Sequence, residues 1–559
     1  MANPDPSATR TQRWLRLAPG TLIVLGALLR LRAYFHFRPL WLDEAMLSLN
    51  IGSRSFVQLL KPLTDDQSAP IPFLWATRLS ITVGGMNEAS LRLLPLVCGV
   101  LLLVLLWRTA RNLLDTLPAL VALAMAVLSP LLIYYSNEVK PYVVDALVTL
   151  IVVNAVLVVI ADSESPKPWR RLGLTGVFAV LASAPAFLVL AGAGAALLFT
   201  PGIWAGRESR RRLLFTGTAW ACTFGVVYVA FIRPAASNPY LQTYWASSFL
   251  SPLEPHLASR AASAFGTTMQ GIFVGDGGSW RATVGLALLL GCAAGAVRLA
   301  RTRGVPILML LVVPPLAAVA ASMVHRYPIA PRLMLFASPL TILLLAAGLD
   351  GFTARLERGA RTVALLVVSG AILLLPLRGA IHGFIAPSEQ EDVRSLTKMF
   401  AREHRRGEAI YVFSRSVPSW AFYSTDWSAP DLLRIGRLTE LVGSSGPAFR
   451  NAPTRGRAVA NEGDSLQFRE ADFQELIGIP AGTGPTLEEP GGAERPDTGW
   501  ADNERRRIRI AAGLEPAWVL VSSFKPAVGT ELLRSLKEGG ATILSRSESA
   551  SGFLLKVKF

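Results

Sequence analysis

The sequence predicts a polytopic α-helical membrane protein that ends in a water-exposed α/β domain. Hydrophobic residues make up 52% of the 559 residues and charged residues only 17%, whereas soluble proteins carry about 25% charged residues. Long runs with almost no charge fill the chain up to about residue 380, and most of the charge lies between or after them. From about residue 388 the composition returns to that of a soluble domain.

Eleven apolar runs are candidates for membrane-spanning helices, because a hydrocarbon core of about 30 Å requires roughly 20 apolar residues. The polar, basic segment before the first run has no convincing small-residue cleavage site, so we expect that run to be retained as a helix. The candidate spans are 18–35, 91–107, 117–135, 142–161, 172–184, 186–204, 213–232, 282–298, 305–323, 333–349 and 362–378.

The charges between the runs predict which side of the membrane each loop faces. With a cytoplasmic N-terminus, every short inner loop is basic, as at Arg210–Arg212, which is the positive-inside pattern. The first loop 36–90, the middle loop 233–281 and the C-terminal tail then lie outside the cytoplasmic membrane. The net charge of +16 is largely explained by this topology, so membrane lipids and not nucleic acid are the expected surroundings.

We therefore divide the chain into a transmembrane module, 1–385, and an extracytoplasmic α/β domain, 386–559. In the second part EAIYVFS (408–414) and AWVLVSS (517–523) have the pattern of strands, and the chain ends in a predicted hairpin. TELLRSLKEGG is predicted to form an amphipathic helix closed by glycine. The Gly-, Pro- and charge-rich stretch 443–506 predicts a flexible insertion.

Ionisable groups gather on the predicted outer face, where such groups usually line a cavity or pair with one another. A carboxylate can accept the proton of a nucleophile while cations neutralise a departing phosphate. These groups therefore suit a reaction with an anionic, phosphate-bearing substrate. The ionisable groups on this face are Asp43, Glu44, Glu138, Lys140, Arg326 and Arg332.

Structural explanations remain open for several of these groups. Glu88 and Arg92 have the spacing of an ordinary helix ion pair, and Lys140 could simply extend its amine to the interface. Asp145, inside the fourth span, could be a structural partner of a neighbouring helix. The three cysteines lie in apolar runs, the five histidines are scattered singly, and neither a P-loop nor an HExxH motif is present, so no metal site is predicted.

Three motifs on the same predicted side resemble the GT-C superfamily of membrane glycosyltransferases: LWLDEA, YSNEVKPY and YPIAPRLMLFASP, in that order. More closely, the chain resembles the bacterial branch related to protein O-mannosyltransferases and lipid A aminoarabinose transferases. The tail, with EDVRSLTKMF and EAIYVFSRSVPSWAFYS, is similar to the extracytoplasmic domains of that branch. The resemblance covers most of the chain.

The resemblance implies transfer of a hexose or pentose from a polyprenyl-phosphate carrier to an envelope glycan, lipid or protein, usually with inversion. It implies no cofactor, although metal dependence varies across the superfamily. Asp43 would be the catalytic base, with Glu44 in the same pocket and Glu138 as a second acid. Lys140 stands where the family more often has arginine. We assign substrate and phosphate contacts to Lys140, Arg332, Arg326, Arg92 and Tyr142.

The sequence departs from the family pattern in the first loop, where QSAPIPFLW (67–75) lacks the histidine of the usual HPPLY stretch. Contacts made by that stretch are therefore in doubt, and the choice of Asp43 over Glu44 as the base rests on resemblance. Two other functions stay open. A transporter or flippase of lipid-linked sugars would have acids deep in several spans and internal repeats, and a non-catalytic envelope scaffold would tolerate loss of the acids.

Overall fold

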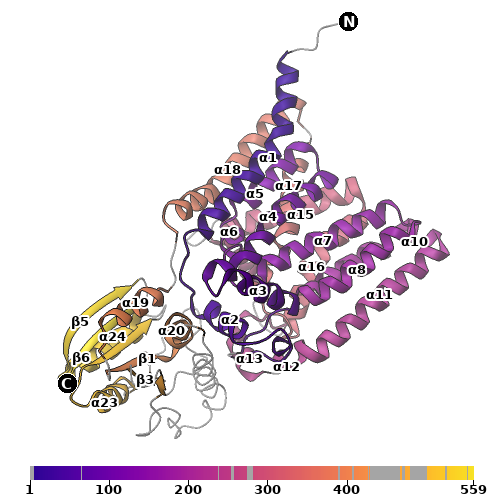
Figure 1. The fold of residues 1–559 in the computed structure, drawn as a ribbon. Coiled ribbons are helices and arrows are strands. Elements are labelled where there is room, and N and C mark those ends of the chain that lie inside the picture. The colour runs from indigo at the N-terminus through magenta and orange to yellow at the C-terminus, as the bar shows by residue number, and fades with distance from the viewer. Residues whose placement is uncertain are drawn as a thin grey trace.

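The computed structural model describes residues 6–64, 66–236, 238–252, 257–273, 281–354, 356–387, 391–405, 408–425, 427, 466–468, 473–478, 500–522, 526–549 and 552–559. A large helical module occupies the chain up to Ile385, and a smaller α/β domain follows beside one end of it (Figure 1).

All eleven predicted spans are helical. Eight of the described helices are long and apolar enough to cross a membrane, and α5 and α9 are shorter apolar helices. The third and sixth predicted spans are each two helices. Ser129 caps a new helix that starts at Pro130, and α9 ends at Leu198 before a second helix starts at Pro201. The helices are α1 (Pro6–Tyr34), α4 (Glu88–Leu113), α5 (Thr116–Leu128), α6 (Pro130–Tyr135), α7 (Tyr142–Ala161), α8 (Pro166–Ala182), α9 (Ala186–Leu198), α10 (Pro201–Ala205), α11 (Arg207–Val227), α15 (Arg281–Arg303), α16 (Val305–Met323), the turn η4 (Leu333–Ala337), α17 (Ser338–Thr353) and α18 (Arg358–Ile385).

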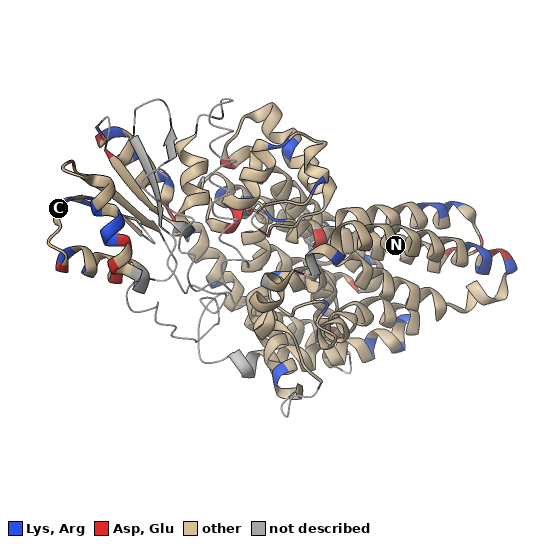
Figure 2. Ribbon diagram, turned by 90° about the horizontal axis from the view of Figure 1, so that it is seen from below, with Lys and Arg blue, Asp and Glu red and all other residues tan. Residues whose placement is uncertain are grey.

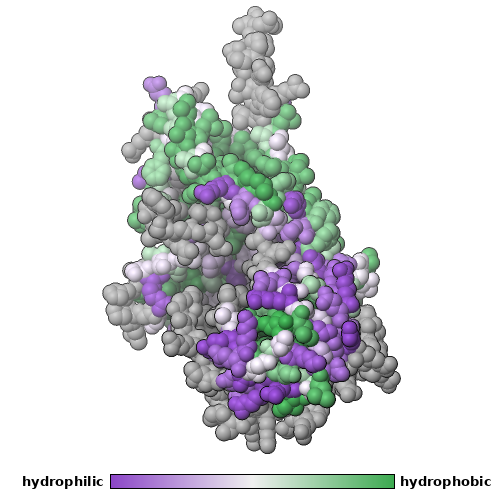
Figure 3. All heavy atoms as spheres, turned by 90° about the vertical axis from the view of Figure 1, so that its left-hand side faces the viewer, coloured by the Kyte–Doolittle hydropathy of each residue, from purple (hydrophilic) through white to green (hydrophobic). Residues whose placement is uncertain are grey.

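The outside of the helical module is apolar. Leu214 and Phe215 of α11 are 70% and 64% exposed, and Val367 of α18 is 65% exposed. Figure 2 shows the Lys and Arg of the module mostly at helix ends, and Figure 3 shows hydrophobic surface over the module and hydrophilic surface over the α/β domain. An apolar surface of this extent is expected of helices surrounded by lipid. The protein is thus a multi-pass membrane protein.

Helices α15 and α17 pack closely through glycine. A Cβ on Gly295 would collide with the carbonyl of Leu344, and a Cβ on Gly348 would collide with the carbonyl of Gly291. Small residues allow this backbone approach, which is a common means of helix association in membranes.

We expect Gly295→Ala to destabilise the protein by about 1–3 kcal/mol, because the added methyl group meets backbone that cannot move aside. Gly370→Ala in α18 is the matched control, since nothing lies within 4 Å of a Cβ there and alanine is the better helix former. Thermal unfolding of both variants in detergent measures the difference. Equal melting temperatures would contradict the close α15–α17 packing.

The two long predicted loops contain helices. The first holds α2 (Leu42–Ser53), η1 (Gln58–Leu60) and α3 (Ile71–Gly84). The middle loop follows η2 (Tyr228–Ile232) and holds α12 (Arg233–Ala236), α13 (Pro239–Tyr244), η3 (Ala246–Ser248) and α14 (Leu257–Phe273). In Figure 1, α2, α12 and α13 lie at the end of the module nearest the α/β domain.

The α/β domain is built on a six-stranded mixed sheet with the strand order β2-β3-β1-β4-β6-β5. Strand β1 lies parallel to β3 and β4, and β5 and β6 form the predicted antiparallel hairpin. The predicted strands and the glycine-closed helix are therefore confirmed. The elements are α19 (Val393–Glu403), β1 (Ala409–Phe413), η5 (Ser414–Ser416), α20 (Val417–Ser424), β2 (Leu466–Phe468), β3 (Phe473–Gly478), α23 (Trp500–Ala512), β4 (Ala517–Ser522), α24 (Pro526–Glu538), β5 (Thr542–Ser549) and β6 (Gly552–Lys558).

The prediction that 443–506 is a flexible insertion is wrong for three segments. Strand β2, strand β3 and the start of α23 fall inside it, and β3 pairs with β1 along its length. The composition of the stretch concealed them, because a strand of three to six residues carries little sequence signal amid glycine and proline. The other residues of this stretch lie outside the described part of the chain.

Alternation along β1 divides the apolar side chains between two cores. Tyr411 and Phe413 pack on the side of α23 and α24. Ile410 and Val412 face the opposite side, and their core continues into the membrane module. That second core includes Leu40, Ala45, Leu47, Leu49, Phe73 and Leu91 together with Leu396, Phe400, Trp420 and Trp518. The α/β domain and helix α2 therefore share one hydrophobic core.

Candidate active site

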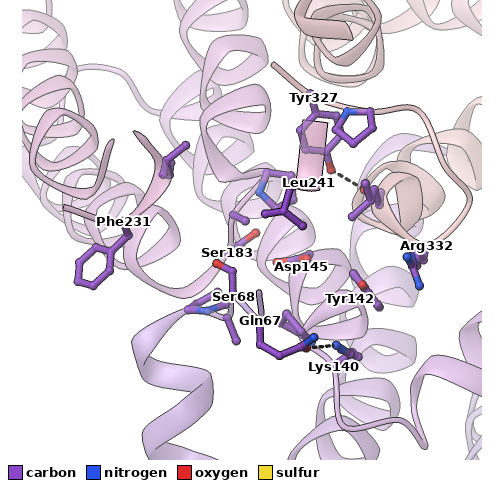
Figure 4. Close-up of a pocket in the computed structure, with 18 of the residues that line it drawn as sticks. Gln67, Ser68, Lys140, Tyr142, Asp145, Ser183, Phe231, Leu241, Tyr327 and Arg332 are labelled. Carbon is purple, nitrogen blue, oxygen red and sulfur yellow. Dashed lines mark hydrogen bonds between the residues drawn. The ribbon is translucent and has the colours of Figure 1, made fainter. Parts of the chain in front are cut away.

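A cavity of about 640 Å³ lies between α2, the start of α7, the α8–α9 turn and the segments around residues 241–249 and 325–333. One side is polar and carries Asp43, Gln67, Lys140, Tyr142 and Arg332. In Figure 4, Phe231 lies opposite Arg332, Tyr142 and Lys140, with Asp145 and Ser183 between them. The apolar side is lined by Val180, Leu181, Pro185, Phe187, Phe224, Val227, Phe231 and Ile232.

Asp43 lies at the polar side, in the first turn of α2. Its Oδ2 atom is 3.2 Å from Nη1 of Arg332 and 4.0 Å from Nζ of Lys140. The Asp43 side chain is 24% exposed, so it is accessible from the cavity. The fold thus brings together three of the predicted site residues, including Asp43 and Arg332, which are 289 positions apart.

Arg332 is held by aromatic residues of the middle loop. Its Nη2 donates to the hydroxyl of Tyr244 at 2.8 Å, and its guanidinium carbon lies 4.8 Å from the ring centre of Trp245. Arginine stays charged in any such environment. The side chain is therefore a fixed cation beside Asp43. Sequence reasoning did not find Tyr244 or Trp245, because the middle loop offered no motif.

Lys140 is buried and lines the cavity. Its amine donates to Oε1 of Gln67 at 2.7 Å (Figure 4). Burial lowers the pKa of Lys140, while the charge of Asp43 opposes that shift. Gln67 and its neighbour Ser68 belong to the stretch that lacks the family's histidine, and both line the cavity. That stretch therefore does contribute to the site.

Glu44 points away from the cavity into a buried ion-pair network. It accepts from Nη2 of Arg92 at 2.6 Å, from Nη2 of Arg38 at 3.3 Å and from the backbone N–H of Val139 at 2.9 Å. Burial opposes its ionisation, but the charges of Arg92 and Arg38 hold its pKa below the usual value. A carboxylate with these partners cannot reach a substrate in the cavity. Of the two adjacent acids, Asp43 lines the cavity and Glu44 does not.

Two predictions about Arg92 differ from the structure. Its guanidinium donates to Glu44 and to the carbonyls of Arg38 and Pro39, so it stabilises the first loop and is not placed to bind phosphate. Glu88 is not engaged with Arg92 as a helix pair; it accepts from Arg394 and Tyr423 of the α/β domain. Glu88 and Arg92 thus each pair with residues distant in sequence and not with each other across one helix turn.

Glu138 is buried directly behind the cavity wall. Its Oε1 accepts from Nε1 of Trp41 at 3.1 Å, and its Oε2 has no hydrogen-bond partner among the described residues. Burial raises its pKa to about 7, with further contributions from the charges of Glu44 and Asp43. It is therefore a second acid near Asp43, although it does not line the cavity itself.

The remaining predicted residues line the cavity in different ways. Tyr142 stands at the polar side, and Arg326 is exposed where the segment 325–333 meets the cavity. Asp145 is 5% exposed and hydrogen-bonds Ser183, and its Oδ1 has no partner within the described part of the chain. An unpartnered carboxylate oxygen in a cavity wall is suited to accept a hydrogen bond from a ligand.

Sequence reasoning also missed Arg38, which pairs with Glu44 and stacks 4.5 Å from the ring centre of Tyr134. The signal was present, since a lone arginine precedes the acidic pair by a few residues. The described residues contain no group of three or more His, Cys, Asp or Glu arranged to hold a metal ion.

Comparisons with known proteins support the resemblance seen in the sequence. The model of the dolichyl-phosphate-mannose-protein mannosyltransferase family matches residues 68–232, which include Glu138, Lys140 and Tyr142. No curated protein matches the sequence. The matched stretch is less than half of the chain and leaves out Asp43 and Arg332.

Solved structures of similar fold come from bacteria and archaea. ArnT of Cupriavidus metallidurans, bound to undecaprenyl phosphate, is 13% identical with a TM-score of 0.48, over 97% of this chain and 98% of that one. An oligosaccharyltransferase of Archaeoglobus fulgidus, in complex with zinc and sulfate, is 12% identical with a TM-score of 0.48, over 72% of this chain. The present chain spans only 61% of the length of that enzyme.

Proposed function

We propose that this protein is a membrane glycosyltransferase that moves a sugar from a polyprenyl-phosphate carrier to an envelope glycan, lipid or protein. One observation carries the proposal. A partly exposed carboxylate, Asp43, stands 3.2 Å from Arg332 and 4.0 Å from Lys140 in a cavity whose opposite side is apolar. The name of the matched family, with its dolichyl-phosphate-linked sugar and protein acceptor, points the same way.

The donor would bind across the cavity. Its phosphate would lie against Arg332 and Lys140, and the first isoprene units would lie along the apolar side near Phe224, Val227 and Phe231. The α8, α9 and α11 segments that form this side belong to the membrane module, so the remainder of the lipid chain can stay in the bilayer. The sugar would then lie between the two sides, within reach of Asp145 and Ser183.

Asp43 would act as the general base. As the acceptor's hydroxyl or amine attacks the anomeric carbon, its proton passes to Asp43, and the bond between that carbon and the phosphate oxygen breaks. The phosphate leaves with the bonding electrons, and Arg332 and Lys140 neutralise the charge that develops on it. Attack opposite the leaving group inverts the configuration at the anomeric carbon.

The finer points are part of the same proposal. The sugar would be a hexose or a pentose, since 640 Å³ suits one sugar with its phosphate and the start of a lipid chain. The N-terminus would lie in the cytoplasm, and the cavity would open at the outer face of the cytoplasmic membrane, because the loops at the opposite end carry the basic residues. The chemistry drawn from Asp43 and the two cations requires no cofactor.

We expect Arg332→Gln to weaken the binding of undecaprenyl phosphate by about tenfold or more, because a charge-assisted contact to a phosphate is lost. Quenching of tryptophan fluorescence, to which Trp245 beside Arg332 contributes, measures the affinity of purified protein. Lys61→Gln removes the same charge from an exposed site in the first loop and is the control. Equal affinities in the two variants would overturn the assignment of Arg332 to the carrier's phosphate.

A further inference from the structure

The short segment that leads into α2 is held by the α/β domain. The backbone N–H of Leu40 donates to the hydroxyl of Tyr423 at 2.7 Å, and Ser419 donates to the carbonyl of Leu40 at 3.3 Å. The backbone N–H of Leu42 donates to Oε2 of Glu391 at 2.9 Å. These contacts join residues more than 300 positions apart, directly before Asp43.

Glu391 supplies a cap that α2 does not supply for itself. The first N–H groups of a helix have no partner within the helix, and Trp41 at the N-cap position makes no capping hydrogen bond with its side chain. Glu391 satisfies the N–H of Leu42, the first residue of α2, and places a carboxyl group at the positive end of the helix. The next residue is Asp43.

The rest of α2 is fixed from the same side. Ala45 and Leu49 pack in the core that contains Leu396 and Trp420 of the α/β domain. Asp43 and Met46 line the cavity on another face of the helix. Helix α2 therefore lies between the cavity and the α/β domain, and the position of Asp43 depends on both.

We propose that Glu391 of the α/β domain is a positioning residue for sugar transfer, which holds the N-terminus of α2 so that Asp43 stays aligned with Arg332 and Lys140. This inference rests on the proposed function, since it concerns the same site. It gives the α/β domain a direct part in the reaction at the membrane module. Glu391 itself does not line the cavity and touches no substrate.

The surroundings of Glu391 indicate which substitutions are informative. It is 2% exposed, and its Oε1 has no hydrogen-bond partner within the described residues. Burial raises its pKa to about 7, against the opposing effects of the Leu42 N–H and the charge of Arg415. An alanine removes the acceptor and leaves the N–H of Leu42 buried without a partner. A glutamine keeps an oxygen that can accept from that N–H.

The experiment compares Glu391→Ala, Glu391→Gln and Glu504→Ala in full-length protein. Glu504 is a matched control, because it is also a buried carboxylate of the α/β domain, 4% exposed, but it pairs with Arg507 on α23. Transfer is measured in cells at equal membrane levels of protein, as the initial rate at which glycosylated envelope species appear by mass spectrometry. Undecaprenyl phosphate affinity and melting temperature are measured on purified protein.

We expect Glu391→Ala to slow transfer by about tenfold or more, as misplacement of a reacting group does, with undecaprenyl phosphate affinity within about twofold of the wild type. Glu391→Gln should restore most of the rate. Glu504→Ala should transfer at the wild-type rate even if its melting temperature falls as much as that of Glu391→Ala.

Two outcomes would overturn the inference. One is wild-type transfer by Glu391→Ala, and the other is an equal loss in Glu504→Ala at an equal loss of stability. Neither outcome would affect the proposed function, which fails instead if cells with and without the wild-type protein form the same glycosylated envelope species.

Discussion

Replacement of Asp43 by asparagine is expected to slow sugar transfer by a factor of about a hundred to ten thousand, the usual contribution of a general base. Asparagine has nearly the same shape but cannot accept the proton of the acceptor. Because Asp43 is partly exposed and lies in the first turn of α2, the protein should fold and insert normally. Mass spectrometry of envelope glycans, glycolipids and glycoproteins from cells with wild-type or Asp43→Asn protein measures the effect.

The controls for this variant separate loss of chemistry from loss of binding. Asp115→Asn removes a carboxylate that is 71% exposed and pairs with Arg361, and it should transfer normally. Undecaprenyl phosphate should still bind to Asp43→Asn, since Arg332 and Lys140 are retained. If Asp43→Asn transfers normally while Glu138→Gln does not, the base is Glu138, whose pKa near 7 would suit that role.

Replacement of Arg92 by methionine is expected to cost about 3–5 kcal/mol of stability, which is the usual effect of removing one member of a buried ion pair. Glu44 is fully buried and would keep only Arg38 at 3.3 Å and the N–H of Val139. Methionine has a similar length and carries no charge. Thermal unfolding in detergent and the fraction of monodisperse protein on size-exclusion chromatography report the loss.

A second ion pair provides the comparison for Arg92→Met. Arg394 pairs with Glu88 at 2.9 Å, but its side chain is 25% exposed, so Arg394→Met should cost no more than about 1 kcal/mol. A melting temperature of Arg92→Met within about one degree of the wild type would contradict the structural role assigned to this network.

The helical spans could be predicted because their cause is local. A run of about 20 apolar residues in lipid has to satisfy its backbone hydrogen bonds within itself, which leaves the helix as the solution. Reasoning from apolar runs missed the helix break at Ser129-Pro130, where a cap and a proline start a new helix. Reasoning from composition missed β3, whose six residues form a strand by pairing with β1. Partners distant in sequence decide such short elements.

At the candidate site, too, some features could be predicted from local sequence and others depend on distant partners. The motifs and the resemblance that they carry included Asp43, Lys140 and Arg332 among eight candidate residues, and the structure places these three together. Motifs did not indicate that Glu44 and Arg92 belong to a buried network, nor that Tyr244 and Trp245 enclose Arg332. Adjacent residues of a helix face different directions, so the first turn of α2 sends Asp43 to the cavity and Glu44 to the core.

The sequence by itself determined the membrane location, the helices and the residue types available for chemistry, because hydrophobic length and charge act over a few turns of chain. Only the tertiary structure decided which acid reaches the cavity and that the α/β domain holds α2 through Glu391. These features depend on contacts between segments hundreds of residues apart. Their energies come from packing and from the removal of water, which no local pattern in the sequence records.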